Sequence, residues 1–278
     1  MSQIVIVGFG RVGQANAIAL CMAGYSVCYH DIAEPDRHYL TRYAETYRRI
    51  PRIQHLYDQD SVDSSYIVCI GDKVSSDGEQ DITDISSVLD DLKNTEGQVI
   101  LRSTLLPDKL LMLPFDYYVP EFLRTRSAVE DSVSPSSVVI GRNCPGELPS
   151  FLERWCAGAR KVFIGTPVEA ALIKYLSNLW NAARVAFVNE VGSAIGGPAI
   201  VDNFDRISRM IDFAFEKAPY LHYGKAYGGE CLPKDLRAFS RWANDAGNSM
   251  PLLAGICASN EQHASLDDHS QLPEWFSE

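Results

Sequence analysis

One cysteine in this sequence stands in a setting that suits a reactive thiol. The stretch YGGECLPKD, residues 227–235, places Cys231 between a pair of glycines and a proline, with Lys234 three residues further on. The glycines loosen the backbone before the thiol, and the lysine brings a positive charge that favours the thiolate. A thiolate is a nucleophile of covalent catalysis. Because the chain holds seven cysteines, a merely structural thiol is the competing interpretation.

A second pair of polar residues lies in a long helical pattern. Lys174 and Asn178 are four residues apart, so a helix presents both on one face. The neighbours of Lys174 are mostly apolar, and a partly desolvated ammonium group can transfer a proton or stabilise an oxyanion. A solvated lysine on a polar helix face is the alternative that periodicity leaves open.

The first thirty residues carry the clearest local signal. The apolar run IVIV leads into GFGRVG, a helical stretch follows, and a second apolar run ends at Asp31. Such a βαβ unit is typical of dinucleotide binding, because the glycines allow a tight turn, close approach of a pyrophosphate and close packing of the helix. A structural glycine turn is the competing interpretation. The predicted cofactor residues here are Gly8, Phe9, Gly10, Arg11, Val12, Gly13 and Asp31.

Asp31 also indicates which dinucleotide is bound. Its carboxylate can accept the ribose hydroxyls and repels a 2′-phosphate, which favours NAD over NADP. Arg37 is the only nearby basic residue that would favour NADP.

The elements that position these residues follow from alternating strand and helix patterns. The fold class predicted is α/β, with an N-terminal Rossmann doubly wound parallel sheet followed by an all-helical domain built on one long helix. The Rossmann domain is expected at 1–165, the helical domain at 166–262 and a tail at 263–278. Further strands are expected at 66–70, 98–104, 117–120, 137–141 and 161–165, and helices at 82–92, 147–155, 167–195, 199–217, 234–246 and 251–262. The polar run 71–80 is expected to be a mobile surface loop.

The long helix predicts a homodimer as well as a domain core. Its large apolar side chains exceed what one helix face can bury within a monomer. They are Leu172, Leu179, Trp180, Val185 and Phe187.

Composition excludes several classes of partner. The chain has 278 residues and a formal net charge of −11, with no long basic run, so neither nucleic acid nor an anionic membrane is an expected partner. No apolar run approaches the roughly 20 residues of a membrane helix. The cysteines show no metal-ligand spacing, so no metal site is predicted, and with no export signal they are expected to be thiols in the cytoplasm.

Taken together, the motifs resemble the UDP-glucose 6-dehydrogenase and GDP-mannose dehydrogenase family of nucleotide-sugar dehydrogenases. The resemblance rests on VGFGRVG, STLLP (103–107), PEFLRTRSAVED (120–131), EAALIKYLSNLWNAARVAFVNE (169–190), YGGECLPKD and SNE (259–261), in that order. It implies two successive NAD-dependent oxidations of an alcohol to a carboxylate. It further implies that Cys231 is the nucleophile within a catalytic set that includes Lys174, Asn178, Glu121, Thr104 and Asp235. Cofactor contacts are also expected from Ser103, Thr104 and Lys234.

The sequence departs from the family in three places. Residues 69–73, CIGDK, replace the usual Val-Pro-Thr-Pro, and Thr125 replaces the usual glutamate, both near the expected cofactor pocket. Family members also continue into a second nucleotide-binding domain, so this chain is expected to be a short form lacking the C-terminal UDP-binding domain.

The leading interpretation is therefore an NAD-dependent, four-electron dehydrogenase whose substrate is a nucleotide sugar or a related phosphorylated alcohol. Two alternatives remain at this stage. One is a two-electron dehydrogenase of the β-hydroxyacid or 6-phosphogluconate type, which uses a lysine and an asparagine without a cysteine. The other is a non-catalytic NAD-binding partner subunit.

Overall fold

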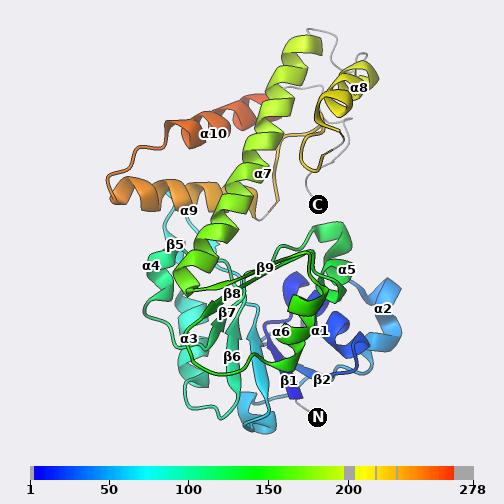
Figure 1. The fold of residues 1–278 in the computed structure, drawn as a ribbon, viewed down its shortest axis with the longest axis vertical. Coiled ribbons are helices and arrows are strands. Elements are labelled where there is room, and N and C mark those ends of the chain that lie inside the picture. The colour runs from blue at the N-terminus through cyan, green and yellow to red at the C-terminus, as the bar shows by residue number, and fades with distance from the viewer. Residues whose placement is uncertain (1–2, 197–203, 217, 230, 266–278) are drawn as a thin grey trace. The chain divides into compact units, whose positions relative to one another are not determined.

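The protein divides into two compact units joined through one long helix. The structure, a computed structural model, describes residues 3–196, 204–216, 218–229 and 231–265. The first unit comprises Met1–Lys73 and Asp81–Lys174, and the second comprises Val74–Gln80 and Tyr175–Glu278 (Figure 1). This division by contacts falls at 174/175, whereas the sequence analysis placed a domain boundary at 165/166.

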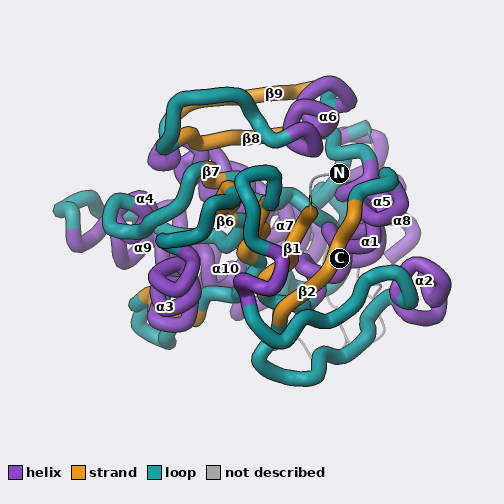
Figure 2. Tube along the Cα trace, turned by 90° about the horizontal axis from the view of Figure 1, so that it is seen from below, coloured by secondary structure: helices purple, strands orange, loops and turns teal. Residues whose placement is uncertain are grey.

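The first unit is built on a seven-stranded sheet in the order β2-β1-β3-β6-β7-β8-β9 (Figure 2). All neighbouring strands are parallel except β7 and β8, which are antiparallel. The predicted α/β class with a doubly wound sheet is confirmed, and the reversal at β8 is an addition that the sequence analysis did not contain. The strands are β1 Gln3–Val7, β2 Ser26–His30, β3 Ser65–Val68, β6 Gln98–Leu101, β7 Tyr117–Tyr118, β8 Ser137–Arg142 and β9 Lys161–Gly165.

Helices cover both faces of this sheet. They are α1 Arg11–Met22, α2 Leu40–Tyr47, α3 Thr83–Leu92, α4 Pro107–Leu110, α5 Ala128–Val133 and α6 Ser150–Gly158, with 3₁₀ turns at Leu56–Gln59 and Thr125–Ser127. The sequence analysis found α1, α3 and α6 but not the shorter α2, α4 and α5.

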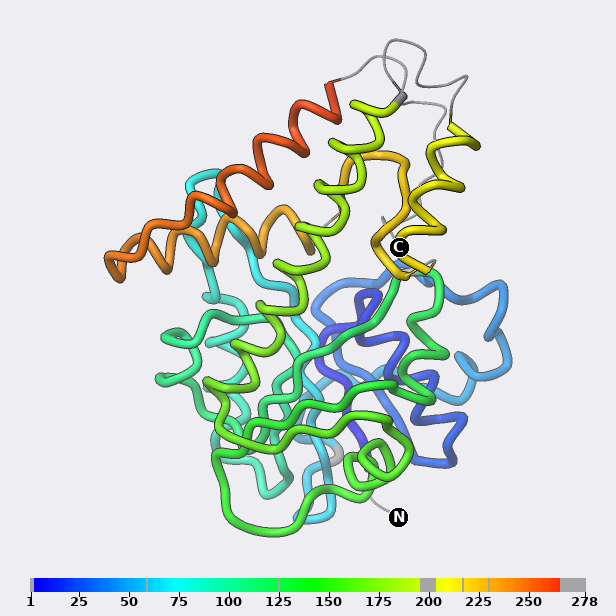
Figure 3. The backbone as a smooth tube through the Cα atoms, turned by 45° about the horizontal axis from the view of Figure 1, so that its top comes forward, coloured from blue at the N-terminus to red at the C-terminus, as the bar shows by residue number. Residues whose placement is uncertain are grey.

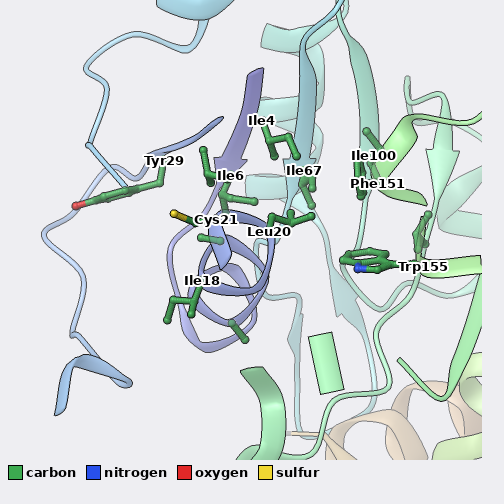
Figure 4. Packing of buried hydrophobic residues seen from close by; sticks show 14 of the residues in the cluster. Ile4, Ile6, Ile18, Leu20, Cys21, Tyr29, Ile67, Ile100, Phe151 and Trp155 are labelled. Atoms are coloured by element: carbon green, nitrogen blue, oxygen red, sulfur yellow. The ribbon is translucent and has the colours of Figure 1, made fainter. Parts of the chain in front are cut away.

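Alternate residues of β1 enter two different cores. Ile4 and Ile6 pack with α1 and with Phe151 of α6, as Figure 4 shows. Val5 and Val7 pack on the opposite face with α3 and α4. A strand that is buried on both faces has no polar side, which explains the continuous apolar run in the sequence.

The long helix α7, Pro167–Gly196, starts with a clear signal. The Thr166 hydroxyl accepts from the Glu169 N–H at 3.3 Å, and the Glu169 carboxylate accepts from the Thr166 N–H at 2.8 Å. This reciprocal capping box, with proline at the first helical position, fixes where the helix begins. Gly141 of β8 allows the close approach, since a Cβ there would lie 2.4 Å from the Cα of Pro167.

The second unit is helical, as predicted. The later turns of α7 pack with α9 (Leu232–Asp245) and α10 (Pro251–Ala264) around one cluster that includes Leu179 and Leu236. They pack with α8 (Phe204–Phe215) around a second cluster at Val188 and Tyr223. Figure 3 shows the course of the backbone through these helices. Part of the predicted helix 199–217 and most of the predicted tail 263–278 lie outside the described residues, while 263–264 close α10.

The run expected to be a mobile loop is instead a hairpin. Strands β4 Lys73–Val74 and β5 Gln80–Asp81 pair, and the turn between them belongs to the second unit. Arg241 of α9 holds this turn through ion pairs with Asp77 and, at 3.0 Å, with Glu79. The expectation was wrong because a polar run gives no sign of a charged partner that lies far along the chain.

Candidate functional site

The glycine turn after β1 has the geometry that the motif predicts. Gly8 has φ +86°, a conformation that side chains disfavour, and a Cβ on Gly13 would lie 2.1 Å from the Gly8 carbonyl oxygen. Gly10 differs, because a Cβ there would meet no protein atom within 4 Å. Gly8 and Gly13 are therefore needed by the fold itself. Gly10 leaves open space at the N-terminus of α1, which fits the close approach of a pyrophosphate.

Asp31 lies directly beside this turn. Its Oδ2 accepts from the backbone N–H of Phe9 at 2.7 Å, and its Oδ1 accepts from that of Ala33 at 2.9 Å. Each carboxylate oxygen has a second lone pair, so both can still accept a ribose hydroxyl. The residues thus fit a dinucleotide with a free ribose.

The side chains of the turn differ in what they can offer a cofactor. Phe9 is buried, and its ring stacks on Tyr29 with centroids 3.8 Å apart. A cofactor could therefore contact the backbone of Phe9 but not its ring. Arg11 is exposed at the first residue of α1, and Val12 is half-buried behind it.

The loop after β6 carries Ser103 and Thr104. The Ser103 hydroxyl donates to the Ile70 carbonyl at 2.5 Å, which ties the ends of two neighbouring strands together, and Thr104 is half-buried next to it. Burial raises the pKa of the Cys69 thiol, which begins the CIGDK departure, to about 12. This thiol is therefore neutral at physiological pH.

Lys174 is held in a buried ion pair. Its side chain is 5% exposed, and its Nζ lies 3.6 Å from Oε1 of Glu121, which follows β7. The same ammonium lies 5.1 Å from the centroid of the Phe122 ring, and Oε2 of Glu121 accepts from the Leu123 N–H at 2.6 Å. The alternative of a solvated surface lysine is wrong. Within the first unit, the structure brings together two of the predicted catalytic residues.

The second unit brings together another set around the start of α9. Cys231 is exposed at the N-cap position, and its carbonyl accepts from the Asp235 N–H at 3.0 Å. Asp235 is buried, and its two carboxylate oxygens accept from Asn178 at 2.6 Å and from Lys234 at 2.7 Å. The N-terminus of a helix favours negative charge, so this position suits a thiolate. Asn178 lies one turn of α7 beyond Lys174, on the same face.

Sequence reasoning missed several residues around these sets. Phe122 was inside a quoted motif, but nothing in its type revealed the contact with Lys174. Arg102 is buried at the end of β6 with its guanidinium 5.0 Å from the Trp155 ring centroid, and burial lowers its pKa. Asn189 and Asn260 bond the backbone of the loop that leads to Cys231. Both asparagines lie inside quoted motifs, 169–190 and 259–261, but nothing in those motifs indicated which backbone groups they bond.

The sheet and its glycine turn define the first unit as an α/β fold of the dinucleotide-binding class. Residues 168–262 match the family model described as UDP-glucose/GDP-mannose dehydrogenase family, central domain. Those residues are thus similar to that central domain, and the resemblance seen in the sequence is confirmed.

Relatives extend the match over most of the chain. A GDP-mannose 6-dehydrogenase of Pseudomonas syringae pv. tomato is 30% identical over 226 residues, covering 70% of this chain and 50% of the relative. A UDP-glucose 6-dehydrogenase of Rickettsia felis is 27% identical over 301 residues, covering 94% and 65%. This chain therefore spans about half to two thirds of the length of these relatives.

Solved structures agree on the fold. A UDP-glucose dehydrogenase from the archaeon Pyrobaculum islandicum matches with a TM-score of 0.75 at 21% identity, covering 94% of this chain and 68% of that one. A ternary complex of GDP-mannose dehydrogenase from Pseudomonas aeruginosa matches with a TM-score of 0.64 at 24% identity over the same shares.

The described residues contain neither a metal-binding cluster nor a membrane-spanning helix. Among them, no group of three or more His, Cys, Asp or Glu side chains could hold a metal ion. None of the helices in the described ranges is long and apolar enough to cross a membrane.

Proposed function

We propose that this protein is an NAD-dependent nucleotide-sugar dehydrogenase that oxidises a primary alcohol of its substrate to a carboxylate. One observation carries the proposal: an exposed Cys231 occupies the N-cap position of α9, whose first turn holds a buried Asp235 bonded to Asn178. The relatives named for GDP-mannose and UDP-glucose 6-dehydrogenase support the substrate class. A nucleotide sugar, or a related phosphorylated alcohol, is the proposed substrate.

The first oxidation converts the alcohol to an aldehyde. The hydroxyl proton passes to a water molecule or to Glu121, and the oxygen that becomes negative is stabilised by Lys174 and Asn178. NAD, when bound, accepts one hydride from carbon in each of the two oxidations. The glycine turn and Asp31 are proposed to hold its pyrophosphate and ribose, with further contacts from Ser103, Thr104 and Lys234.

The second oxidation needs a carbon that carries an additional heteroatom, and the thiol supplies it. The Cys231 thiolate adds to the aldehyde carbon, a carbon–sulfur bond forms, and the carbonyl oxygen becomes the alkoxide of a thiohemiacetal. Loss of hydride from that carbon gives a thioester. Water, oriented by Asp235 on the first turn of α9, then attacks the thioester, and the carbon–sulfur bond breaks to release the acid and restore the thiolate.

The number of NADH molecules formed per substrate separates this reaction from its alternatives. Two would support the four-electron dehydrogenase, one a two-electron dehydrogenase, and none a non-catalytic NAD-binding partner. The exposed cysteine at the helix start favours the first, because the two-electron enzymes do not need it.

Replacement of the thiol tests the mechanism directly. Cys231→Ser should retain the fold and NAD binding but abolish net acid formation, because a hydroxyl is a far weaker nucleophile than a thiolate at neutral pH. Lys174→Ala should instead depress both oxidations. Cys156→Ser, in the half-buried α6 thiol, is the matched control and should behave as the parent protein. Acid formation at the parental rate by Cys231→Ser would refute the covalent mechanism.

We also propose that the protein is a homodimer that uses α7. Trp180 and Phe187, two of the side chains predicted to exceed one face, are exposed, whereas Leu179 and Val185 are buried in the monomer. The exposed apolar side chains recur at helical spacing along one stripe, which is Leu176, Trp180, Phe187, Val191 and Ile195. A contiguous apolar stripe of this kind supports an interface between copies. Sedimentation as a monomer at micromolar concentration would contradict it.

A further inference from the structure

The loop that leads to Cys231 is held by side chains of two helices. This loop is the described part, residues 221–229 and 231, of the connection between α8 and α9, and its buried backbone groups cannot bond within a helix or a sheet. Such groups each cost about 1–3 kcal/mol if they are left without a partner. The backbone N–H and carbonyl groups of this loop therefore need hydrogen-bond partners from other elements.

Two asparagines each bond a donor and an acceptor of the loop backbone. Asn189 of α7 is buried, and its amide accepts from the Gly224 N–H at 3.1 Å and donates to the Lys225 carbonyl at 2.9 Å. Asn260 of α10 accepts from the Tyr227 N–H at 2.8 Å and donates to the carbonyl of the same residue at 3.0 Å. An amide that bonds both polar groups of one residue fixes its orientation as well as its position.

A buried histidine bonds the backbone near the start of the loop. His263 of α10 lies with Nε2 2.6 Å from the Gly224 carbonyl and Nδ1 3.2 Å from the Ser193 hydroxyl. Gly224 is thus bonded at both its N–H, by Asn189, and its carbonyl, by His263.

Cys231 therefore lies between two anchors. After Tyr227 the chain passes through Gly228 and Gly229, the latter with φ +70°, before the N-cap position of α9. The start of α9 fixes the thiol from one side. On the other side, within the described residues 218–229, the last backbone groups held by a side chain of another helix are those of Tyr227. Because glycines impose little direction of their own, the path between these points depends on the Tyr227 anchor.

We infer that Asn260 is a positioning residue for Cys231: it clamps Tyr227 and so sets the direction from which the loop presents the thiol. The inference rests on the proposed function, in which the thiolate must meet the aldehyde carbon. A displacement of about 1 Å at a reacting group can cost roughly 100-fold in rate. Loss of the clamp therefore acts on the second oxidation more than on the first.

The test uses the full chain and two readouts. In Asn260→Ala, amide hydrogen exchange in residues 224–229 should accelerate at least about tenfold while α9 and α10 keep their protection. With substrate and NAD, the same variant should release aldehyde, trapped by a hydrazine, so that the ratio of acid to aldehyde falls at least about tenfold. Asn260→Asp keeps the acceptor and loses the donor, so it should fall between the parent and Asn260→Ala.

A core variant of the same helix separates positioning from general destabilisation. Leu253→Ala empties a buried site in α10 and should cost about 2–5 kcal/mol in the free energy of unfolding. It should leave the acid-to-aldehyde ratio unchanged. Unchanged exchange in Asn260→Ala, or faster exchange with an unchanged ratio, would overturn the inference. A parent protein that forms no NADH would overturn the proposed function instead, and the exchange readout would then decide alone whether Asn260 clamps the loop.

Discussion

Two glycines of the same turn should respond to alanine in opposite ways. A methyl group on Gly13 would lie 2.1 Å from a backbone oxygen of Gly8, which cannot move without shifting the turn. A methyl group on Gly10 would meet no protein atom within 4 Å, and its φ of −72° is one that alanine adopts. Gly13→Ala should therefore damage the fold, and Gly10→Ala should damage NAD binding.

The magnitudes follow from the contacts. Overpacking usually costs about 1–3 kcal/mol. A clash with backbone lies at the upper end of that range, and the gain in helix propensity on replacing Gly13 returns about 1 kcal/mol. The net loss of about 2 kcal/mol should lower Tm by about 4–8 °C. Gly10→Ala changes only an N-cap, which costs under about 1 kcal/mol, but its methyl group occupies the space left for the pyrophosphate and should weaken NAD binding at least about tenfold.

Denaturant unfolding and calorimetric titration with NAD, applied to both variants and the parent, measure the two effects separately. Parental stability in Gly13→Ala would refute the packing argument. Parental NAD affinity in Gly10→Ala would refute the assignment of the open space to a cofactor. Equal loss of stability in both variants would show that Gly10, like Gly13, is required by the fold and not by a ligand.

Three further outcomes can be checked on the same protein. Because Asp31 repels a 2′-phosphate, titration should show NADP binding at least about tenfold more weakly than NAD, and equal binding would contradict the role of Asp31. Arg241→Ala removes the ion pairs of the hairpin turn 74–80, so hydrogen exchange there should accelerate while the urea midpoint of global unfolding stays close to that of the parent; unchanged exchange would show that the ion pairs do not hold the turn. Burial raises the pKa of Asp60, but hydrogen bonds from Thr95 and from two backbone N–H groups outweigh it and hold the pKa below the ordinary 3.8. The stability it confers is present above about pH 4 and lost as the pH falls below that, so urea unfolding between pH 6 and 3 should show a smaller loss in Asp60→Asn than in the parent, and identical slopes would refute it.

Local patterns predicted those parts of the molecule whose causes are local. The glycine turn, the strands buried on both faces and the long α7 each leave a continuous signal in the sequence. The antiparallel β8 leaves none, because SVVIG is the same apolar run whichever way the strand points. The hairpin at 74–80 was missed for a related reason, since Arg241 holds it from 164 positions away from Asp77.

In the candidate site too, residues with local signals could be predicted and contacts between distant residues could not. Cys231 and Lys174 could be found from type and setting, and the burial of Lys174 agrees with its apolar neighbours. The cation–ring contact of Phe122 and the clamp by Asn260 depend on three-dimensional neighbours. No spacing along the chain could have revealed either of them.

Because the start of α7 is fixed by its capping box, insertions and deletions between Pro167 and Lys174 should be poorly tolerated. Gly141 pairs with Tyr118 in the sheet and lies next to Pro167. The segments that start at Tyr118 and at Pro167 therefore begin close to the same residue. One runs three residues from Tyr118 to Glu121, at most about 10 Å, and the other runs seven helical residues from Pro167 to Lys174, about 10 Å at 1.5 Å per residue. The Lys174–Glu121 ion pair joins the far ends of these two segments. Deleting one residue between Pro167 and Lys174 would shorten the helix by about 1.5 Å and turn the lysine by about 100°, so this stretch of α7 acts as a spacer of fixed length.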